Sequence, residues 1–166
     1  MKVLIVASGR INKKAFYKKI IQDADKVIAA DGGADNCLKI GIIPDYVIGD
    51  LDSISSKALK KFRNIITYDL SQDTTDLEKS IALAKKLKCT KITIIGAIGS
   101  RIDHTIANII SSMKANVPSE IVDETNNICV VEKKIELSGK KDDIISVIPI
   151  SKVKGLTYLG LKWNLK

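Results

Sequence analysis

Aromatic side chains are scarce in this chain of 166 residues, which holds four Tyr, two Phe and one Trp. Proteins that bind single-stranded nucleic acid without sequence preference stack successive bases on aromatic side chains. No such stacking surface is predicted here, and nucleic acid is not an expected partner. Long hydrophobic runs are missing as well, so neither a transmembrane helix nor a membrane partner is expected.

Cysteine and histidine are also rare in the sequence. The three cysteines, Cys37, Cys89 and Cys129, are an odd number without the spacing of a metal site. They are therefore predicted to be reduced thiols of a cytoplasmic protein. His104 is the single histidine, so the chain has no His and Cys cluster of the kind that binds zinc.

Several common nucleotide-binding and hydrolase motifs are absent. The sequence contains neither G-x-x-x-x-G-K-[ST] nor G-x-G-x-x-G, which argues against a P-loop enzyme and a standard dinucleotide-binding protein. No Gly-flanked serine forms a nucleophile elbow, which argues against a Ser-His-Asp hydrolase. Positive charge, in contrast, is plentiful: Lys and Arg outnumber Asp and Glu by 27 to 19, for a net charge of +8. This excess favours anionic partners such as nucleotides and phosphates.

Short apolar runs alternate with helical patterns up to about residue 113. Strands are predicted at residues 3–7, 27–30, 46–48, 65–68 and 91–97, with a helix after each. The first of these helices, residues 12–22, should bury Ala15, Phe16, Ile20 and Ile21. Thr75 and Glu78 form the T-x-x-E capping box of another helix start. The alternation predicts an α/β fold with a mostly parallel sheet and helices on both faces.

Polar loops follow each of the five predicted strands. The stretch at residues 31–53 shows this best, because Asp31-Gly32-Gly33 follows one apolar run, and Asp50 and Asp52 follow the next. The loops at residues 8–9, 72–76 and 99–104 occupy the same position after their strands. Carboxyl ends of parallel strands meet at one edge of the sheet, where open α/β sheets bind their ligands. All five loops are therefore expected at one site.

The helical period stops after Pro118. Short β-rich segments then alternate with polar turns, at residues 120–123, 128–131, 135–137, 144–150 and 156–165. We therefore expect two domains, an α/β domain at residues 1–123 and a small all-β domain of sandwich type at residues 124–166. Its last strand has no later strand to pair with, which predicts that this domain is incomplete at the C-terminus.

Oxygen ligands dominate the expected site. Asp50 and Asp52 lie two residues apart on one turn, and Asp76 lies in the first turn of a helix. A few carboxylates together with substrate phosphates suit Mg²⁺. Gly32 and Gly33 allow close approach of a phosphate to the backbone, and Arg101 can bind phosphate oxygens in a bidentate manner. The residues alone thus favour a phosphotransferase that uses a magnesium-bound nucleotide.

Four segments then give the chain a family resemblance. AADGGAD, GDLDS, QDTTDLEK and GSRIDH, in this order and spacing, resemble the thiamine pyrophosphokinase family, as does GLKWNL near the C-terminus. The resemblance implies that the pyrophosphoryl group of ATP is transferred to the hydroxyl group of thiamine, giving thiamine diphosphate and AMP, with Mg²⁺ as cofactor. It also implies a homodimer whose active site lies between the α/β domain of one subunit and the β domain of the other.

The resemblance also assigns roles to individual residues. The catalytic and metal-binding carboxylates would be Asp50, Asp52 and Asp76. Nucleotide contacts would come from Asp31, Gly33, Asp73, Thr75, Arg101, Asp103 and His104. Thiamine would face Gln72 and Asp76. We expect His104 to form hydrogen bonds or support structure rather than act as a general base, and we expect Trp163 to pack within the β domain.

The chain departs from the family pattern at three points. Ser100 stands where the family often has a second glycine, Gln72 stands where many bacterial members have Lys, and the family continues with further β strands after the position of Lys166. Two other functions stay open at this stage. One is a pyrophosphokinase that acts on another alcohol, such as a hydroxymethylpterin. The other is a module that binds magnesium-nucleotide or nucleic acid without catalysis.

Overall fold

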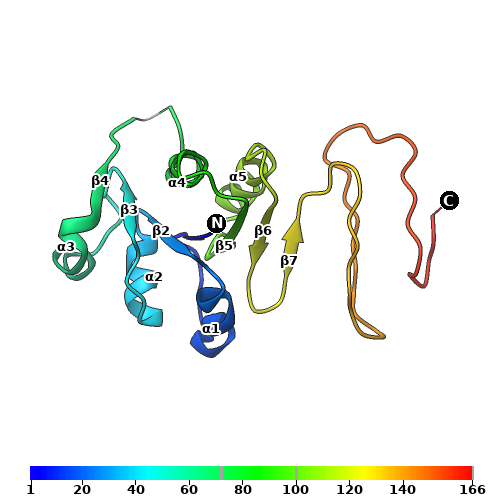
Figure 1. The fold of residues 1–166 in the computed structure, drawn as a ribbon, viewed down its shortest axis with the longest axis horizontal. Coiled ribbons are helices and arrows are strands. Elements are labelled where there is room, and N and C mark those ends of the chain that lie inside the picture. The colour runs from blue at the N-terminus through cyan, green and yellow to red at the C-terminus, as the bar shows by residue number, and fades with distance from the viewer. Residues whose placement is uncertain (72, 100, 166) are drawn as a thin grey trace. The chain divides into compact units, whose positions relative to one another are not determined.

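The computed structural model describes residues 1–71, 73–99 and 101–165. The chain divides into two compact units, Met1–Glu132 and Lys133–Lys166. Within the described residues, the first unit contains a seven-stranded sheet in the order β4-β3-β2-β1-β5-β6-β7 (Figure 1). The strands are β1 (Lys2–Val6), β2 (Lys26–Ala30), β3 (Tyr46–Gly49), β4 (Ile66–Tyr68), β5 (Lys91–Ile95), β6 (Ser119–Val122) and β7 (Asn127–Cys129).

Every neighbouring pair of strands is parallel except β6 and β7, which are antiparallel. The central strand β1 pairs with β2 on one side and with β5 on the other. Strands β2, β3 and β4 therefore lie on one side of β1, and strands β5, β6 and β7 lie on the other side. The point between β1 and β5, where the direction changes, is where open α/β sheets place their ligand crevice.

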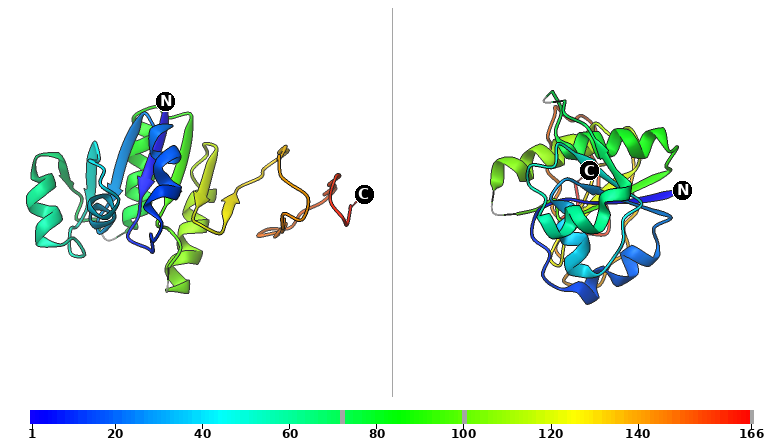
Figure 2. Two further views of the ribbon diagram at one scale, coloured as in Figure 1. Left: turned by 90° about the horizontal axis from the view of Figure 1, so that it is seen from below. Right: turned by 90° about the vertical axis from the view of Figure 1, so that its left-hand side faces the viewer.

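Apolar residues on both sides of each central strand hold the sheet between two layers of helices. In β1, Val3 and Ile5 belong to one buried cluster, and Leu4 and Val6 belong to the other. This split follows from the alternation of side chains along a strand. Helices α4 (Asp76–Lys86) and α5 (Ile102–Met113) cover one face of the sheet, and α1 (Lys14–Gln22), α2 (Gly33–Ile40) and α3 (Ser56–Phe62) cover the other (Figures 1 and 2). A short 3₁₀ helix, η1 (Arg63–Ile65), precedes β4. The predicted α/β fold is thus confirmed.

Helix boundaries follow local signals in the sequence. Thr75 and Glu78 form the predicted capping box at the start of α4. Ser55 caps α3 by accepting a hydrogen bond from the Ala58 N–H, and Gly41 ends α2 with a positive φ of 76°. The buried face of α1 differs from the prediction, because Tyr17 is fully buried while Phe16 is 42% exposed.

The first unit extends beyond residue 123, where the sequence places the domain boundary. Strand β7 pairs with β6, with Ile121 opposite Ile128, so the chain stays in the sheet until Cys129. Glu124 also accepts hydrogen bonds from the backbone N–H groups of Asn12 and Lys13, at 2.8 and 2.9 Å, which ties the β6–β7 turn to the segment before α1.

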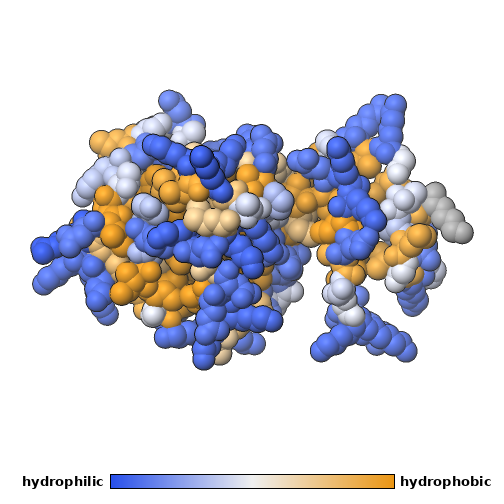
Figure 3. All heavy atoms as spheres, in the orientation of Figure 1, coloured by the Kyte–Doolittle hydropathy of each residue, from blue (hydrophilic) through white to orange (hydrophobic). Residues whose placement is uncertain are grey.

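The second unit, Lys133–Lys166, is less regular than the first in its described residues 133–165. Its extended segments form one isolated antiparallel bridge, between Tyr158 and Leu165, and the expected strands at residues 135–137 and 144–150 form no ladder. Large apolar side chains such as Ile144 and Trp163 are 94% and 76% exposed. Apolar residues are visible at the surface in Figure 3. The predicted all-β domain is therefore shown only in part. No helix within the described residues combines the length and the apolar character that crossing a bilayer would require.

Candidate active site

Parallel strands bring five loops to the carboxyl edge of the sheet. These loops follow β1, β2, β3, β4 and β5. Two of them are joined at the backbone, because the Gly9 N–H donates to the carbonyl of Gly96 at 2.6 Å, and the Arg10 N–H donates to that of Ile98 at 3.1 Å. The buried Asn36 side chain on α2 donates to the carbonyls of Ala7 and Gly9, at 2.7 and 2.8 Å. These backbone hydrogen bonds join the loops after β1 and β5, and Asn36 fixes the loop after β1 to helix α2.

Three carboxylates converge from three of these loops. Asp31, Asp50 and Asp76 each offer one oxygen, and the three oxygens lie within 4.8 Å of one another. Gly49 makes this approach possible: a Cβ atom at this position would lie 2.8 Å from the Asp31 Cβ and 3.2 Å from the Asp76 Oδ1. A side chain on residue 49 would therefore push the carboxylates apart.

The three-carboxylate group fits a hard divalent cation. Asp31 is only 5% exposed, and its Oδ1 atom has no hydrogen-bond partner among the described residues. Burial raises the pKa of Asp31, since an ionised carboxylate loses its hydration there. A buried acceptor without a donor, beside two further carboxylates, is suited to Mg²⁺, which takes oxygen ligands.

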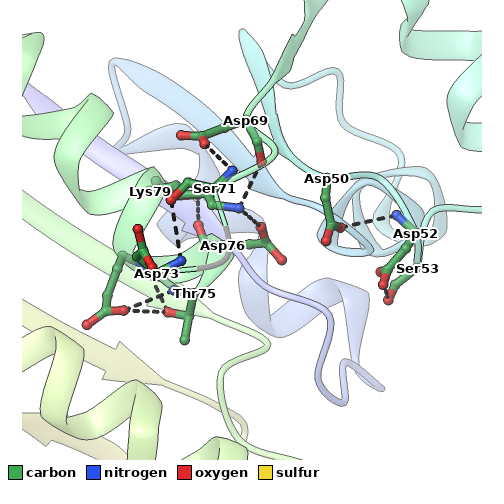
Figure 4. A network of polar contacts seen from close by, with 11 residues as sticks. Asp50, Asp52, Ser53, Asp69, Ser71, Asp73, Thr75, Asp76 and Lys79 are labelled. Atoms are coloured by element: carbon green, nitrogen blue, oxygen red, sulfur yellow. Dashed lines mark hydrogen bonds and ion pairs between the residues drawn. The ribbon is translucent and has the colours of Figure 1, made fainter.

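Asp52 lies beside this group, and its carboxylate is engaged elsewhere. Its Oδ1 accepts a hydrogen bond from the Ser53 hydroxyl at 2.8 Å, and its backbone N–H donates to the Asp50 Oδ1 at 3.3 Å (Figure 4). The described residues thus bring together Asp50 and Asp76 of the expected metal-binding set, with Asp31 as the third carboxylate. Sequence reasoning placed Asp31 among the nucleotide contacts.

Lys79 is a part of this site that sequence reasoning missed. Its side chain on α4 is 4% exposed, and its Nζ lies 3.1 Å from the Asp76 Oδ1. It also donates to the backbone carbonyl of Asp69 at 2.9 Å (Figure 4). The signal was present, because a Lys three residues after an Asp on a helix can form an ion pair with it.

The loop between β4 and α4 carries several expected substrate contacts. Thr75 caps α4, and its hydroxyl lies 3.2 Å from the Glu78 Oε2. The Thr75 backbone N–H donates to Glu78 and holds the pKa of that carboxyl below its usual range. Asp73 is exposed, and its backbone N–H donates to the Ser71 hydroxyl at 3.4 Å. Gln72, the expected thiamine contact, lies outside the described residues.

The start of α5 presents an arginine to solvent. The Arg101 guanidinium binds Asp103 in a bidentate manner, through Nη2 to Oδ2 at 2.5 Å and Nε to Oδ1 at 3.2 Å. This pairing lowers the pKa of Asp103 to about 2. Both side chains are mostly exposed, at 67% and 60%, so the pair contributes little stability and Arg101 can exchange partners. The neighbouring His104 is also exposed.

Gly33, another expected nucleotide contact, lies at the start of α2. A Cβ atom there would lie 1.9 Å from the backbone carbonyl oxygen of Val6, so the residue is needed for close packing of α2 against β1. The structure therefore gives Gly33 a packing role.

Comparison with known proteins agrees with this architecture. The family model described as "Thiamin pyrophosphokinase, catalytic domain" matches residues 17–122, more than half of the chain. A thiamine pyrophosphokinase of Bacillus subtilis is 32% identical over 149 residues, which cover 83% of this chain and 69% of the relative.

Solved structures give the same result. A thiamin pyrophosphokinase from Geobacillus thermodenitrificans superposes with a TM-score of 0.61 at 28% identity, covering 74% of this chain and 60% of that one. One from Candida albicans shows the same fold, with a TM-score of 0.65 at 18% identity, covering 76% of this chain and 59% of that one. The chain thus spans about 60% of the solved chains and about 70% of the Bacillus relative. On these matches, the chain belongs to the thiamin pyrophosphokinase family.

Proposed function

We propose that this protein transfers the pyrophosphoryl group of ATP to the hydroxyl group of thiamine, forming thiamine diphosphate and AMP. It would therefore act as a thiamine diphosphokinase. The observation that carries the proposal is the group formed by Asp31, Asp50 and Asp76 at the carboxyl edge of the sheet, in a chain of this family. A magnesium-bound triphosphate needs such a set of oxygen ligands.

The metal would be held by Asp31, Asp50 and Asp76, with Asp52 on the same turn as Asp50. When bound, Mg²⁺ supplies charge neutralisation on the phosphate oxygens. The Oδ1 atom of Asp31 has no hydrogen-bond partner among the described residues, which supports the inclusion of Asp31 among the ligands. Asp31 thus joins Asp50 and Asp76 of the set expected from the sequence, and Asp52 would contribute its carboxylate from the same turn as Asp50.

The chain's own residues would position the two reactants. In-line attack on the β-phosphorus requires orientation and stabilisation of charge more than covalent chemistry. Arg101 is exposed at the start of α5, where it can leave Asp103 and bind phosphate oxygens in a bidentate manner. Asp76 would orient the thiamine hydroxyl.

The remaining contacts complete the proposal. Besides Arg101, the nucleotide would be contacted by Gly33, Asp73, Thr75, Asp103 and His104. Thiamine would be contacted by Gln72 and Asp76. Residues 124–166 would form a β-sandwich domain that binds thiamine. The protein would work in the cytoplasm as a homodimer. The exposed apolar side chains of residues 133–165 support association, because such patches mark interaction surfaces.

The deciding experiment is an assay with ATP, Mg²⁺ and thiamine, in which AMP and thiamine diphosphate are quantified by chromatography. We expect the two products in equal amounts and neither product without Mg²⁺. A parallel reaction with a hydroxymethylpterin tests the alcohol. Formation of AMP with the pterin but not with thiamine would contradict the proposed substrate, and absence of AMP with both would contradict pyrophosphoryl transfer.

A further inference from the structure

Lys79 is an almost fully buried cation beside the three-carboxylate group. Its side chain on α4 is 4% exposed. Lysine is rarely buried to this degree unless its ammonium group is paired, because a charge loses much of its hydration there. The partners that hold Lys79 in place therefore indicate what the residue does.

The two described partners of Lys79 lie at opposite ends of one segment. The Nζ atom lies 3.1 Å from the Asp76 carboxylate, at the start of α4, and 2.9 Å from the carbonyl oxygen of Asp69, just after β4. The backbone N–H of Asp69 in turn donates to the carbonyl of Gly49 at 3.0 Å. Lys79 thus contacts both Asp69 and Asp76, and the backbone of Asp69 is joined in turn to the end of β3.

Lys79 also acts on the charge of the site. Three carboxylate oxygens within 4.8 Å of one another repel, and the Lys79 ammonium group is the cation that directly contacts Asp76. A carboxylate has about four lone-pair positions, so a hydrogen bond from Lys79 leaves Asp76 able to bind a metal ion as well. The contact therefore orients Asp76 without blocking it.

We propose that Lys79 is a positioning residue, which holds Asp76 among the metal-binding carboxylates and fixes the base of the segment that contacts the substrates. The inference rests on the proposed function, because it assigns Asp76 to a magnesium-nucleotide site. In this role Lys79 would act on the substrates through Asp76. Its effect is on the affinity of the site for a divalent cation and on the rate of the bound complex.

The test compares Lys79→Met and Lys79→Arg with the wild-type protein, and uses Lys86→Met as a matched control. Lys86 is an exposed lysine on the same helix. Binding of Mn²⁺ in the presence of ATP is measured by electron paramagnetic resonance, which does not depend on turnover. Residues that orient metal ligands typically contribute about 10- to 100-fold to affinity or activity, so we expect Lys79→Met to weaken Mn²⁺ binding by that factor.

Further measurements separate positioning from a general structural role. In Lys79→Met, kcat should fall and the Mg²⁺ concentration for half-maximal rate should rise, while the KM for ATP at saturating Mg²⁺ changes little. Lys79→Arg keeps the charge and should recover part of the affinity, and Lys86→Met should behave as wild type. If Lys79→Met does not fold, Lys79→Gln replaces it with the same expectation.

A folded Lys79→Met or Lys79→Gln protein that binds Mn²⁺ as the wild type does would overturn the proposal. So would failure of the wild-type protein to bind Mn²⁺ with ATP. A wild-type protein that binds both but forms no AMP would contradict the proposed function alone, since the comparison of Mn²⁺ affinities would still decide the role of Lys79.

Discussion

Two single residues, Gly49 and Lys79, allow three negatively charged carboxylates to lie close together in the site. Asp31, Asp50 and Asp76 approach because Gly49 has no side chain between them, and Lys79 offsets part of their charge. Burial raises the pKa of Asp31, so ionisation of this carboxyl is less favourable than in water. The site is therefore arranged for a ligand that brings positive charge.

Asp50→Asn should nearly abolish turnover and leave the fold intact. Asparagine keeps the oxygen that can accept the hydrogen bond from the Asp52 N–H, so the turn should survive while the metal ligand is lost. We expect a loss of more than about 100-fold, since loss of a residue that only orients a metal ligand already costs about 10- to 100-fold. Activity is measured across a Mg²⁺ titration, with circular dichroism to check folding. The control is Asp23→Asn, which changes an exposed carboxylate at the end of α1. Near wild-type activity of Asp50→Asn at limiting Mg²⁺ would refute the assignment of Asp50 as a metal ligand.

The types of residue at the site could be predicted from the sequence better than their partners could. Asp50 and Asp76 were expected together, because both follow strands of the predicted parallel sheet. Asp31 follows a strand as well, but only the close approach allowed by Gly49 shows that it joins them. The orientation of Asp52 toward Ser53 depends on the local turn, which sequence spacing does not determine.

Arg101→Ala should lower the rate on the order of 100-fold or more, by analogy with the loss of one preorganised donor at a site of developing charge. The KM for ATP should rise more than the KM for thiamine, because Arg101 is proposed to bind phosphate. Steady-state kinetics with each substrate varied in turn gives both values. Arg63→Ala, in η1, serves as the control for loss of an exposed arginine. Equal and small effects on both substrates would make Arg101 an ordinary surface residue.

Among the elements, α4 connects stability with the site. Its capping box orders the first turn, and that same turn carries Asp76. The sequence could predict this element because a capping box is a local signal, complete within four residues. The buried face of α1 could not be predicted in the same way. Phe16 and Tyr17 are adjacent, and Tyr17 is the one that packs with distant apolar residues such as Ile40 and Ile95 in a buried cluster.

Replacement of either capping side chain should destabilise the first unit. Thr75→Ala removes the N-cap and should cost about 1 kcal/mol. Glu78→Gln should remove a pH-dependent part instead. The pKa of Glu78 is lowered in the folded state, mainly by the Thr75 N–H, so its contribution is present above the unfolded-state pKa of about 4.3 and is lost as the pH falls through the folded-state pKa. Urea unfolding between neutral and acidic pH measures both effects.

The control for these capping variants is Thr74→Ala, which changes an exposed neighbour. It should leave both the stability at neutral pH and its acid dependence unchanged. If Glu78→Gln loses stability on acidification as steeply as the wild type does, the Thr75–Glu78 interaction has no role in the acid response.

For the whole molecule, the two units differ in how far the sequence determines them. The parallel sheet was predictable because its buried strands are continuous apolar runs separated by helices with clear periodicity. The domain boundary near residue 124 stays a prediction, and the chain beyond it pairs with β6 through β7. In residues 133–165 the strand pattern is present, but pairing is limited to the single bridge between Tyr158 and Leu165. A strand is stabilised only when other strands or a packed face cover it.

Association is therefore the expected behaviour of the whole protein. In the second unit, Ile144, Ile148 and Trp163 are 94%, 72% and 76% exposed, and large exposed apolar surface marks interaction sites. We predict a dimer at micromolar concentration in sedimentation velocity. Trp163 is the single tryptophan in the sequence, so its emission should move to shorter wavelength as dilute protein is concentrated. Ile148→Asp should weaken association, and Ser151→Asp, which adds the same charge at an exposed polar position, should not. A monodisperse monomer with fully solvated Trp163 emission at every concentration would contradict the prediction.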